Sequence, residues 1–150
     1  MIEKLFGHIE NARRLLLDAA QKLDKESFLG RSKGASSIRD LFVHLMDAED
    51  FWIGSVILGE KRQKFVPEKY EDVRTLSGNW TGIHLRTKKL VSDISAGHVS
   101  LQMSVPWEKD TTLDVGSILL HVAAHEIHHD GEICLLMRQR GHEPPYLDLL

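Results

Sequence analysis

The sequence predicts an all-α protein with the architecture of a four-helix bundle. Four segments of about 20 residues carry apolar side chains three and four positions apart, which is the period of an amphipathic helix. Polar or glycine-containing breaks separate these segments. Helices of this kind bury their apolar faces against one another as a bundle. A chain of 150 residues can bury a sizeable core, so we expect one domain over residues 1–150.

The first two helices are predicted over residues 2–23 and 37–58. Apolar residues recur at helical spacing through the first of them. At the start of the second, Ser37 is followed three residues later by Asp40, the pattern of a capping box in which a hydroxyl caps the helix and an acid bonds back. Gly59 is a plausible stop, because glycine readily leaves the helical conformation.

The last two helices are predicted over residues 72–96 and 112–140. Asp114 falls in the first turn of the fourth helix, where the helix dipole favours an acid, and Gly141 follows its basic last turn. Between the two helices, residues 99–105 alternate apolar and polar side chains. This alternation indicates a short strand or β-hairpin before the last helix.

Composition excludes several classes of protein. The formal net charge is −3 and no run of Lys or Arg is long, which argues against a nucleic-acid-binding face. No apolar run reaches the ~20 residues of a membrane span, and the N-terminal segment lacks the pattern of a signal peptide. Cys134 is the one cysteine, so no intramolecular disulfide can form and a reducing compartment is expected. We therefore predict a cytoplasmic protein.

The stretch His125-Glu126-Ile127-His128-His129 carries the clearest chemical signal. Four helical residues place His129 one turn from His125 and within about 40° of it, so both imidazoles share a face that can hold one divalent ion. Helical phase puts both rings and Glu126 on the apolar stripe of the fourth helix. A single histidine on such a stripe is more commonly a polar core residue. Two of them with an interior acid leave a metal site and a metal-free polar core as comparable interpretations.

The second helix offers a third ligand. His44 lies on the margin of its apolar stripe and can point inward. Bundle sites are commonly assembled from side chains on facing helices. His44, His125 and His129 would form a three-histidine site with open coordination positions, which is the catalytic rather than the structural arrangement for zinc. A bound water there would have its pKa lowered toward about 7.

The stretch also matches H-E-x-x-H, the pattern of zinc peptidases. The further glycine and histidine of the metzincin form are replaced by Glu132 and Leu135. The short segment after His129 contains Gly141 and two prolines and offers no later helix to supply a glutamate ligand. Nothing upstream resembles the sheet that would hold a peptide. A peptidase is therefore disfavoured.

Taken together, these motifs resemble the DinB-like family of metal-binding four-helix bundles over nearly the whole chain. His44, Glu49 and Trp52 are similar to that family's H-x4-E-x-x-W helix. Residues 121–131 resemble its second histidine motif, and residues 137–145 resemble its C-terminal segment. The sequence differs from many relatives in carrying Asp130 and Glu132 where they have Arg and Gln. This difference removes a basic position that could bind an anionic substrate.

The resemblance implies an up-down-down-up topology and one divalent metal ion, zinc or nickel, held by His44, His125 and His129. It also implies a homodimer. Some members of the family are thiol transferases or isomerases that use bacillithiol or mycothiol, and others are hydrolase-like. The family's name refers to induction by DNA damage and not to DNA binding.

Our first hypothesis is a metal-dependent enzyme, a hydrolase or thiol transferase acting on a small molecule such as a low-molecular-weight thiol. Glu126 is the candidate base, or else a hydrogen-bonding partner of a ligand. The alternatives are a non-catalytic metal-binding protein of the stress response and a bundle without a metal. Helical phase predicts Trp52 and Trp80 in the core, while Trp107 either covers the pocket mouth or packs its own loop.

Overall fold

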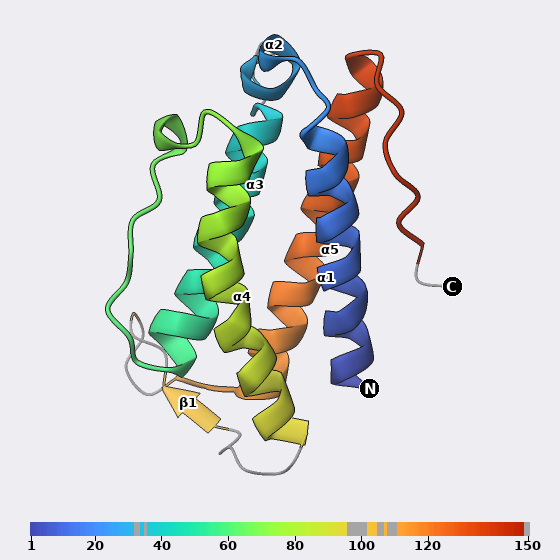
Figure 1. Ribbon diagram of the computed structural model, residues 1–150. Coiled ribbons are helices and arrows are strands. Elements are labelled where there is room, and N and C mark those ends of the chain that lie inside the picture. Colours follow the sequence, from blue (N-terminus) through green and yellow to red (C-terminus); the bar gives the residue numbers. More distant parts are fainter. Residues whose placement is uncertain (32–33, 35, 96–101, 105–106, 108–110, 149–150) are drawn as a thin grey trace.

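Four long helices form a bundle in the structure, a computed structural model. It describes residues 1–31, 34, 36–95, 102–104, 107 and 111–148. The long helices are α1 (Ile2–Ala20), α3 (Ile38–Glu49), α4 (Val73–Ser95) and α5 (Val115–Gln139). Helices α1 and α3 each pack against both α4 and α5. Helices α1 and α5 run in one direction and α3 and α4 in the other (Figure 1), which confirms the bundle and its up-down-down-up topology.

The second predicted helix changes its winding halfway. Helix α3 ends at Glu49, and the chain continues as a π-helix, η1 (Asp50–Ile57). A π-helix forms hydrogen bonds five residues apart, so the angle per residue falls below the 100° on which the predicted phase depends. Trp80 lies in the core and is 2% exposed, as predicted. The prediction for Trp52 was wrong, because this ring lies half-buried at the edge of the bundle.

Shorter elements connect the helices. The sequence pattern missed helix α2 (Lys25–Leu29) and the 3₁₀ turn η2 (Pro67–Lys69). The predicted hairpin exists as strand β1 (Gln102–Ser104) paired antiparallel with β2 (Thr112–Asp114). The remaining residues of the predicted 99–105 strand lie outside the described part of the chain.

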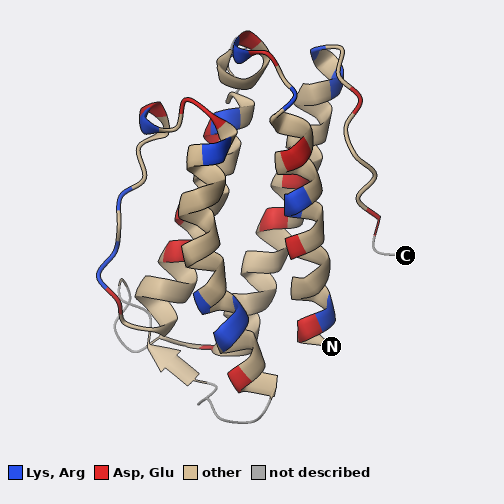
Figure 2. Cartoon of the chain, viewed as in Figure 1, with Lys and Arg blue, Asp and Glu red and all other residues tan. Residues whose placement is uncertain are grey.

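The last helix begins later than predicted, because residues 112–114 belong to β2. Asp114 is the N-cap of α5 rather than a first-turn residue, and its carboxylate accepts hydrogen bonds from the backbone of Gly116 and Ser117. This cap joins the hairpin directly to α5. Among the described residues, no helix has the length and apolar character needed to cross a membrane. Figure 2 shows Lys and Arg scattered among Asp and Glu along the helices, with no basic face in this view.

The predicted capping box at the start of α3 is confirmed. The backbone N–H of Asp40 donates to the Ser37 hydroxyl at 3.0 Å, and the Ser37 N–H donates to the Asp40 carboxylate at 3.3 Å. We expect Ser37→Ala to lower the free energy of unfolding by about 1 kcal/mol, because a backbone N–H loses its partner. Urea denaturation measures this loss. Ser36→Ala, at the exposed preceding residue, should stay within about 0.5 kcal/mol of the unchanged protein, and equal losses in both variants would contradict the cap.

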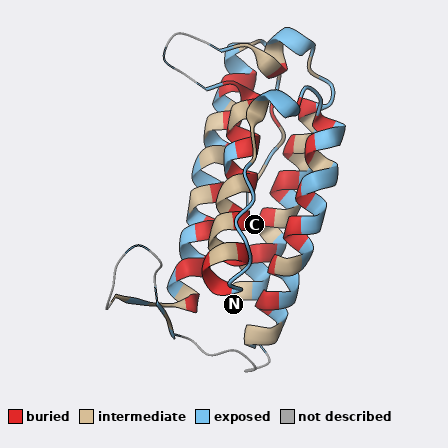
Figure 3. Ribbon diagram, turned by 90° about the vertical axis from the view of Figure 1, so that its left-hand side faces the viewer, coloured by how far each residue is buried: buried red, intermediate tan, exposed pale blue. Residues whose placement is uncertain are grey.

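The core is divided in two by a layer of buried polar residues. Buried residues follow the inward faces of the helices (Figure 3), and the apolar ones form two separate clusters. On each long helix, a polar side chain lies between the residues of one apolar cluster and those of the other. We call these residues the central polar layer: Arg13 on α1, Glu49 at the end of α3, His84 and Thr87 on α4, and Glu126 and Asp130 on α5.

Candidate metal centre

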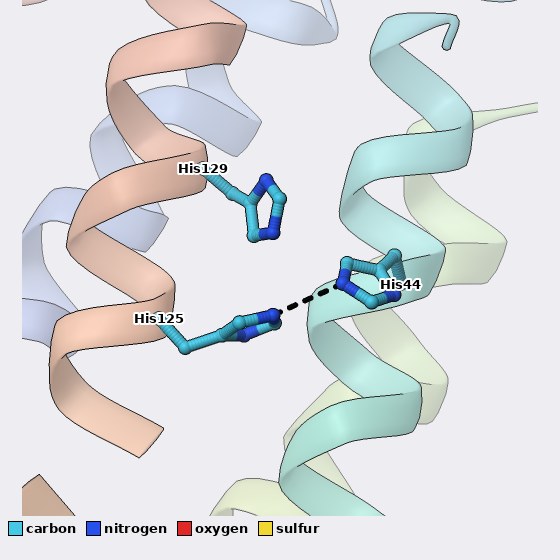
Figure 4. Close-up of side chains that lie close together, drawn as sticks. All are labelled: His44, His125 and His129. Carbon is cyan, nitrogen blue, oxygen red and sulfur yellow. Dashed lines mark hydrogen bonds between the residues drawn. The ribbon is translucent and has the colours of Figure 1, made fainter. Parts of the chain in front are cut away.

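Three histidines from two helices converge between α3 and α5. His125 and His129 lie one turn apart on α5 and face His44 of α3 (Figure 4). The Nε2 atoms of His44 and His125 are 3.0 Å apart. One ring nitrogen from each of the three histidines lies within 4.8 Å of those of the other two. The structure thus brings together the three side chains that the sequence singled out.

The nitrogen that His129 directs into this space can be identified by its other contact. Its Nδ1 lies 2.5 Å from Oε2 of Glu132, three residues further along α5. The remaining nitrogen, Nε2, is therefore the one available to an ion. Figure 4 shows a nitrogen of each ring turned toward the space between the three side chains. All three histidines accordingly offer Nε2.

The spacing of these atoms fits a single ion. Zinc–imidazole bonds of about 2.0–2.1 Å at tetrahedral angles hold two ligand nitrogens about 3.3 Å apart. The distance of 3.0 Å between the Nε2 atoms of His44 and His125 differs from this value by a few tenths of an ångström. Three imidazoles form a donor set suited to zinc or nickel. The residues present therefore fit a divalent metal ion.

The surroundings of His125 and His44 keep these two rings neutral. Burial, followed by repulsion from His129 and His44, lowers the pKa of His125 to about 4. Burial and the neighbouring His129 also lower the pKa of His44. Near pH 7 both rings therefore carry a free lone pair, the state in which an imidazole binds a metal. His44 is exposed and the other two rings are half-buried, so a small molecule can reach the site from solvent.

Glu126 points elsewhere. Successive helical residues project about 100° apart, so the residue after His125 faces α1 rather than α3. Its two carboxylate oxygens accept hydrogen bonds from Nε and Nη2 of Arg13 at 2.7 and 2.5 Å, and the residue is 3% exposed. Glu126 thus belongs to the central polar layer, and the structure places it with Arg13 instead of with the three imidazoles.

Glu49, from the motif on the second predicted helix, organises the same layer. Its carboxylate accepts hydrogen bonds from Nε1 of Trp80 and Oγ1 of Thr87, both at 2.6 Å. Nδ1 of His84 lies 2.9 Å away and Nη2 of Arg13 lies 3.0 Å away. Burial opposes ionisation, but the Arg13 charge and these hydrogen bonds lower the pKa of Glu49 to about 2. Glu49 is therefore a buried anion with four donors.

Glu126 and Asp130, the other two acids of the central polar layer, have raised rather than lowered pKa values. Among the described residues, only Arg13 donates hydrogen bonds to the Glu126 side chain, and burial raises the pKa of Glu126. Burial and the nearby Glu126 charge raise the pKa of Asp130 to about 8. Asp130 is 4% exposed and belongs to the central polar layer. The layer fixes the face that α5 presents to α1, and hence the face left for His125 and His129.

An aromatic wall formed by Phe51, Trp52 and Trp107 stands beside the histidines. Trp52 packs against His121 with ring centroids 5.0 Å apart, and His121 stacks on His125 at 5.9 Å. Trp107 contacts both Phe51 and Trp52 and remains 56% exposed. Trp107 therefore packs against the other two rings of the wall and also exposes part of its side chain to solvent next to the site. Sequence phase missed this wall, because it depends on the π-helical winding of η1.

Comparison with known proteins agrees with this architecture. The model of the family described as the DinB family matches residues 1–150. An uncharacterized protein, YizA, of Bacillus subtilis (strain 168) is 24% identical over 122 residues, which cover 79% of this chain and 74% of that protein.

Two solved structures share the fold. A DinB-like protein, YjoA, from Bacillus subtilis superimposes with a TM-score of 0.71 at 18% identity, covering 96% of each chain. A DinB-like protein from Bacillus cereus ATCC 10987 gives a TM-score of 0.58 at 16% identity, covering 93% of this chain and 95% of that one. At these sequence identities, the two structures support the assignment of the fold and nothing further.

Proposed function

The chain belongs to the DinB family, and from this premise we propose that it binds one divalent metal ion, zinc or nickel, through Nε2 of His44, His125 and His129. The convergence of three imidazoles between α3 and α5 is the observation that carries the proposal. Their spacing fits the ligand separation of a single ion. In the metal-free alternative, the Nε2 atoms of His44 and His125 share a hydrogen bond across 3.0 Å, and His129 keeps its contact with Glu132, so the three rings form a polar cluster.

We further propose that the bound ion serves a reaction on a small molecule, either hydrolysis or transfer of a thiol. Three protein ligands leave coordination positions open for a substrate. When bound, a divalent ion supplies Lewis acidity, which lowers the pKa of an adjacent water or thiol. The exposed His44 and the half-buried His125 and His129 leave the ion open to a substrate. The aromatic wall provides an apolar surface against which the organic part of the substrate can pack.

The charge around the site narrows the class of substrate. Glu132 lies against His129, and the cation nearest the aromatic wall, Arg62, is paired with Asp47 at 3.0 Å. Among the described contacts of these residues, no unpaired basic side chain is present that could bind an anionic thiol such as bacillithiol. Neutral esters and neutral thiol conjugates fit these surroundings better than anionic substrates do. Glu126 has no role at the ion in this proposal, and the homodimer stays a prediction of the family resemblance.

The alternative function is metal binding without catalysis, as in a stress-response protein. The same three histidines support it equally, because coordination alone does not specify turnover. Hydrolysis of simple esters or exchange of thiol conjugates by the metal-loaded protein, lost in His125→Ala, would separate the enzyme from the binding protein.

Metal analysis of the purified, untagged protein tests the common part of both functions. We expect about one zinc or nickel per chain after incubation with each ion and dialysis, and a fall to near zero in His125→Ala because the site loses a central ligand. His8→Ala, on α1 and outside the three-histidine group, is the control and should keep the full metal content. A wild-type protein that retains neither ion would leave a bundle with polar histidines between α3 and α5.

A further inference from the structure

We propose that Glu132 is a positioning residue for the metal site, because it holds His129 with Nδ1 protonated and Nε2 facing the ion. This inference rests on the proposed metal binding. Its basis is the distance of 2.5 Å between Nδ1 of His129 and Oε2 of Glu132. The two residues are three apart on α5, the spacing at which helical side chains meet on one face.

The chemistry of the pair determines the tautomer. An ionised carboxylate can only accept hydrogen bonds, so the imidazole nitrogen that it contacts must carry the proton. With the proton on Nδ1, the lone pair of the neutral ring lies on Nε2 and points toward His44 and His125. Metal-ligating histidines generally use their second nitrogen in this way, and the partner fixes the orientation of the ring and raises its basicity.

The contacts of Glu132 favour this role over that of a direct ligand. Its carboxylate also lies 3.7 Å from Nε2 of His128, and the group His128, His129 and Glu132 could by spacing hold an ion of its own. An ion bonded to nitrogen and oxygen at about 2.0–2.2 Å would hold these atoms roughly 3 Å apart or more. The separation of 2.5 Å is shorter than two ligands of one ion allow, so the two atoms share a hydrogen bond with no ion between them. His128 is 67% exposed at its side chain and stands outside this bond.

A carboxylate at residue 132 and the isosteric amide would act differently on His129. A glutamine at residue 132 could donate through its amide as well as accept, so it would not impose one tautomer on His129. A glutamate accepts only. The carboxylate therefore gives this chain a fixed His129 ligand and, through its charge, a site that favours a cation over an anion.

Competition between the protein and a chromophoric chelator for zinc tests the proposal, with the visible absorption of the cobalt(II) form as a second reading of the coordination sphere. We expect Glu132→Ala to bind zinc about 10–100-fold more weakly than the wild type. Glu132→Gln, which keeps an oxygen acceptor, should fall between the two. His128→Ala removes the other neighbour of the carboxylate and should keep wild-type affinity at one ion per chain. Imidazole ¹⁵N shifts of the metal-free protein should report Nδ1–H at His129 in the wild type and a mixture of tautomers in Glu132→Ala.

The outcomes separate this inference from the function on which it rests. A wild type that binds no zinc, nickel or cobalt removes the metal site and the positioning role together. Tight binding by the wild type, loss in His125→Ala and unchanged affinity and tautomer in Glu132→Ala would overturn the positioning role alone. Two ions per chain, with equal weakening in His128→Ala and Glu132→Ala, would instead make Glu132 a direct ligand of a second ion and would also overturn it.

Discussion

Arg13→Met is expected to lower the free energy of unfolding by about 3–5 kcal/mol, the cost typical of removing one partner of a buried ion pair. Arg13 is 6% exposed and is the cation between Glu49 and Glu126, at 3.0 Å from one and 2.5 Å from the other. Its guanidinium also lies over the ring of Trp80, 4.1 Å from the ring centroid. Methionine fills a similar volume, but it leaves two buried carboxylates facing each other without a positive charge.

Chemical denaturation followed by circular dichroism measures this effect, and the neighbouring residue supplies the control. Arg14 lies on the same turn of α1, but its side chain is 61% exposed and pairs with Asp18 at 3.4 Å. Exposed pairs of this kind contribute little, so Arg14→Met should change the unfolding free energy by less than about 0.5 kcal/mol. Similar small losses in both variants would mean that the central polar layer does not depend on its cation.

These two arginines also show where prediction from sequence ends. The helical period over residues 2–23 is strong, and it correctly indicates a helix there. Helical phase places Arg13, four residues after Ile9 and three before Leu16, on the apolar stripe, and it places Arg14 about 100° away. Phase does not say what would satisfy a buried guanidinium. What buries Arg13 is a carboxylate 113 residues away in the chain, on a helix that arrives only when the bundle forms. Local pattern therefore predicts the helix and the face that Arg13 occupies, while the carboxylate that compensates its buried charge comes from a helix distant in the sequence.

Helical phase likewise predicted one part of the candidate site correctly and missed another part. Phase alone brought His125 and His129 to one face of a helix, because four residues return to nearly the same angle. The same reasoning placed Glu126 toward the interior, and it is indeed buried. In a bundle, however, α5 has two neighbours, and phase does not say which of them a buried side chain meets. Glu126 meets α1 while the histidines meet α3, so an interior acid beside a metal motif was not a member of the site.

The change from α-helical to π-helical winding in the second predicted helix was another source of error in the prediction from sequence. A uniform angle of 100° per residue holds through α3 and carries His44 toward α5. It fails where the chain becomes π-helical after Glu49, and there it misplaced Trp52. Glu49, the last residue of α3 before this junction, directs its carboxylate into the interior of the bundle, where it contacts Arg13 and donors on α4. The aromatic wall next to the histidines thus depends on a change of winding that begins directly after a buried charge.

Glu49→Gln therefore tests the junction and the layer together. The pKa of Glu49 is about 2 in the folded chain against an ordinary value of 4.5. Because the folded value is lower, ionisation of Glu49 stabilises the fold above about pH 4.5, and this contribution is lost as the pH falls through about 2. The difference between the two values corresponds to about 3 kcal/mol. We expect Glu49→Gln to lose roughly this amount at pH 7, since a neutral amide attracts Arg13 less and cannot accept from as many donors.

The pH dependence distinguishes a lost charge from a merely disturbed core. Unfolding free energies of wild type and Glu49→Gln should differ by about 3 kcal/mol at pH 7 and converge as the pH falls from 5 toward 2, because the wild-type carboxylate then becomes neutral as well. A packing defect would instead give a deficit that stays constant over this range. Glu71→Gln is the matched control: its side chain is 69% exposed and pairs with Lys25 at 3.3 Å, so its removal should change stability little at any pH. A constant deficit in Glu49→Gln would show that this residue acts by its shape and hydrogen bonds, and that the charge on Arg13 is balanced by Glu126.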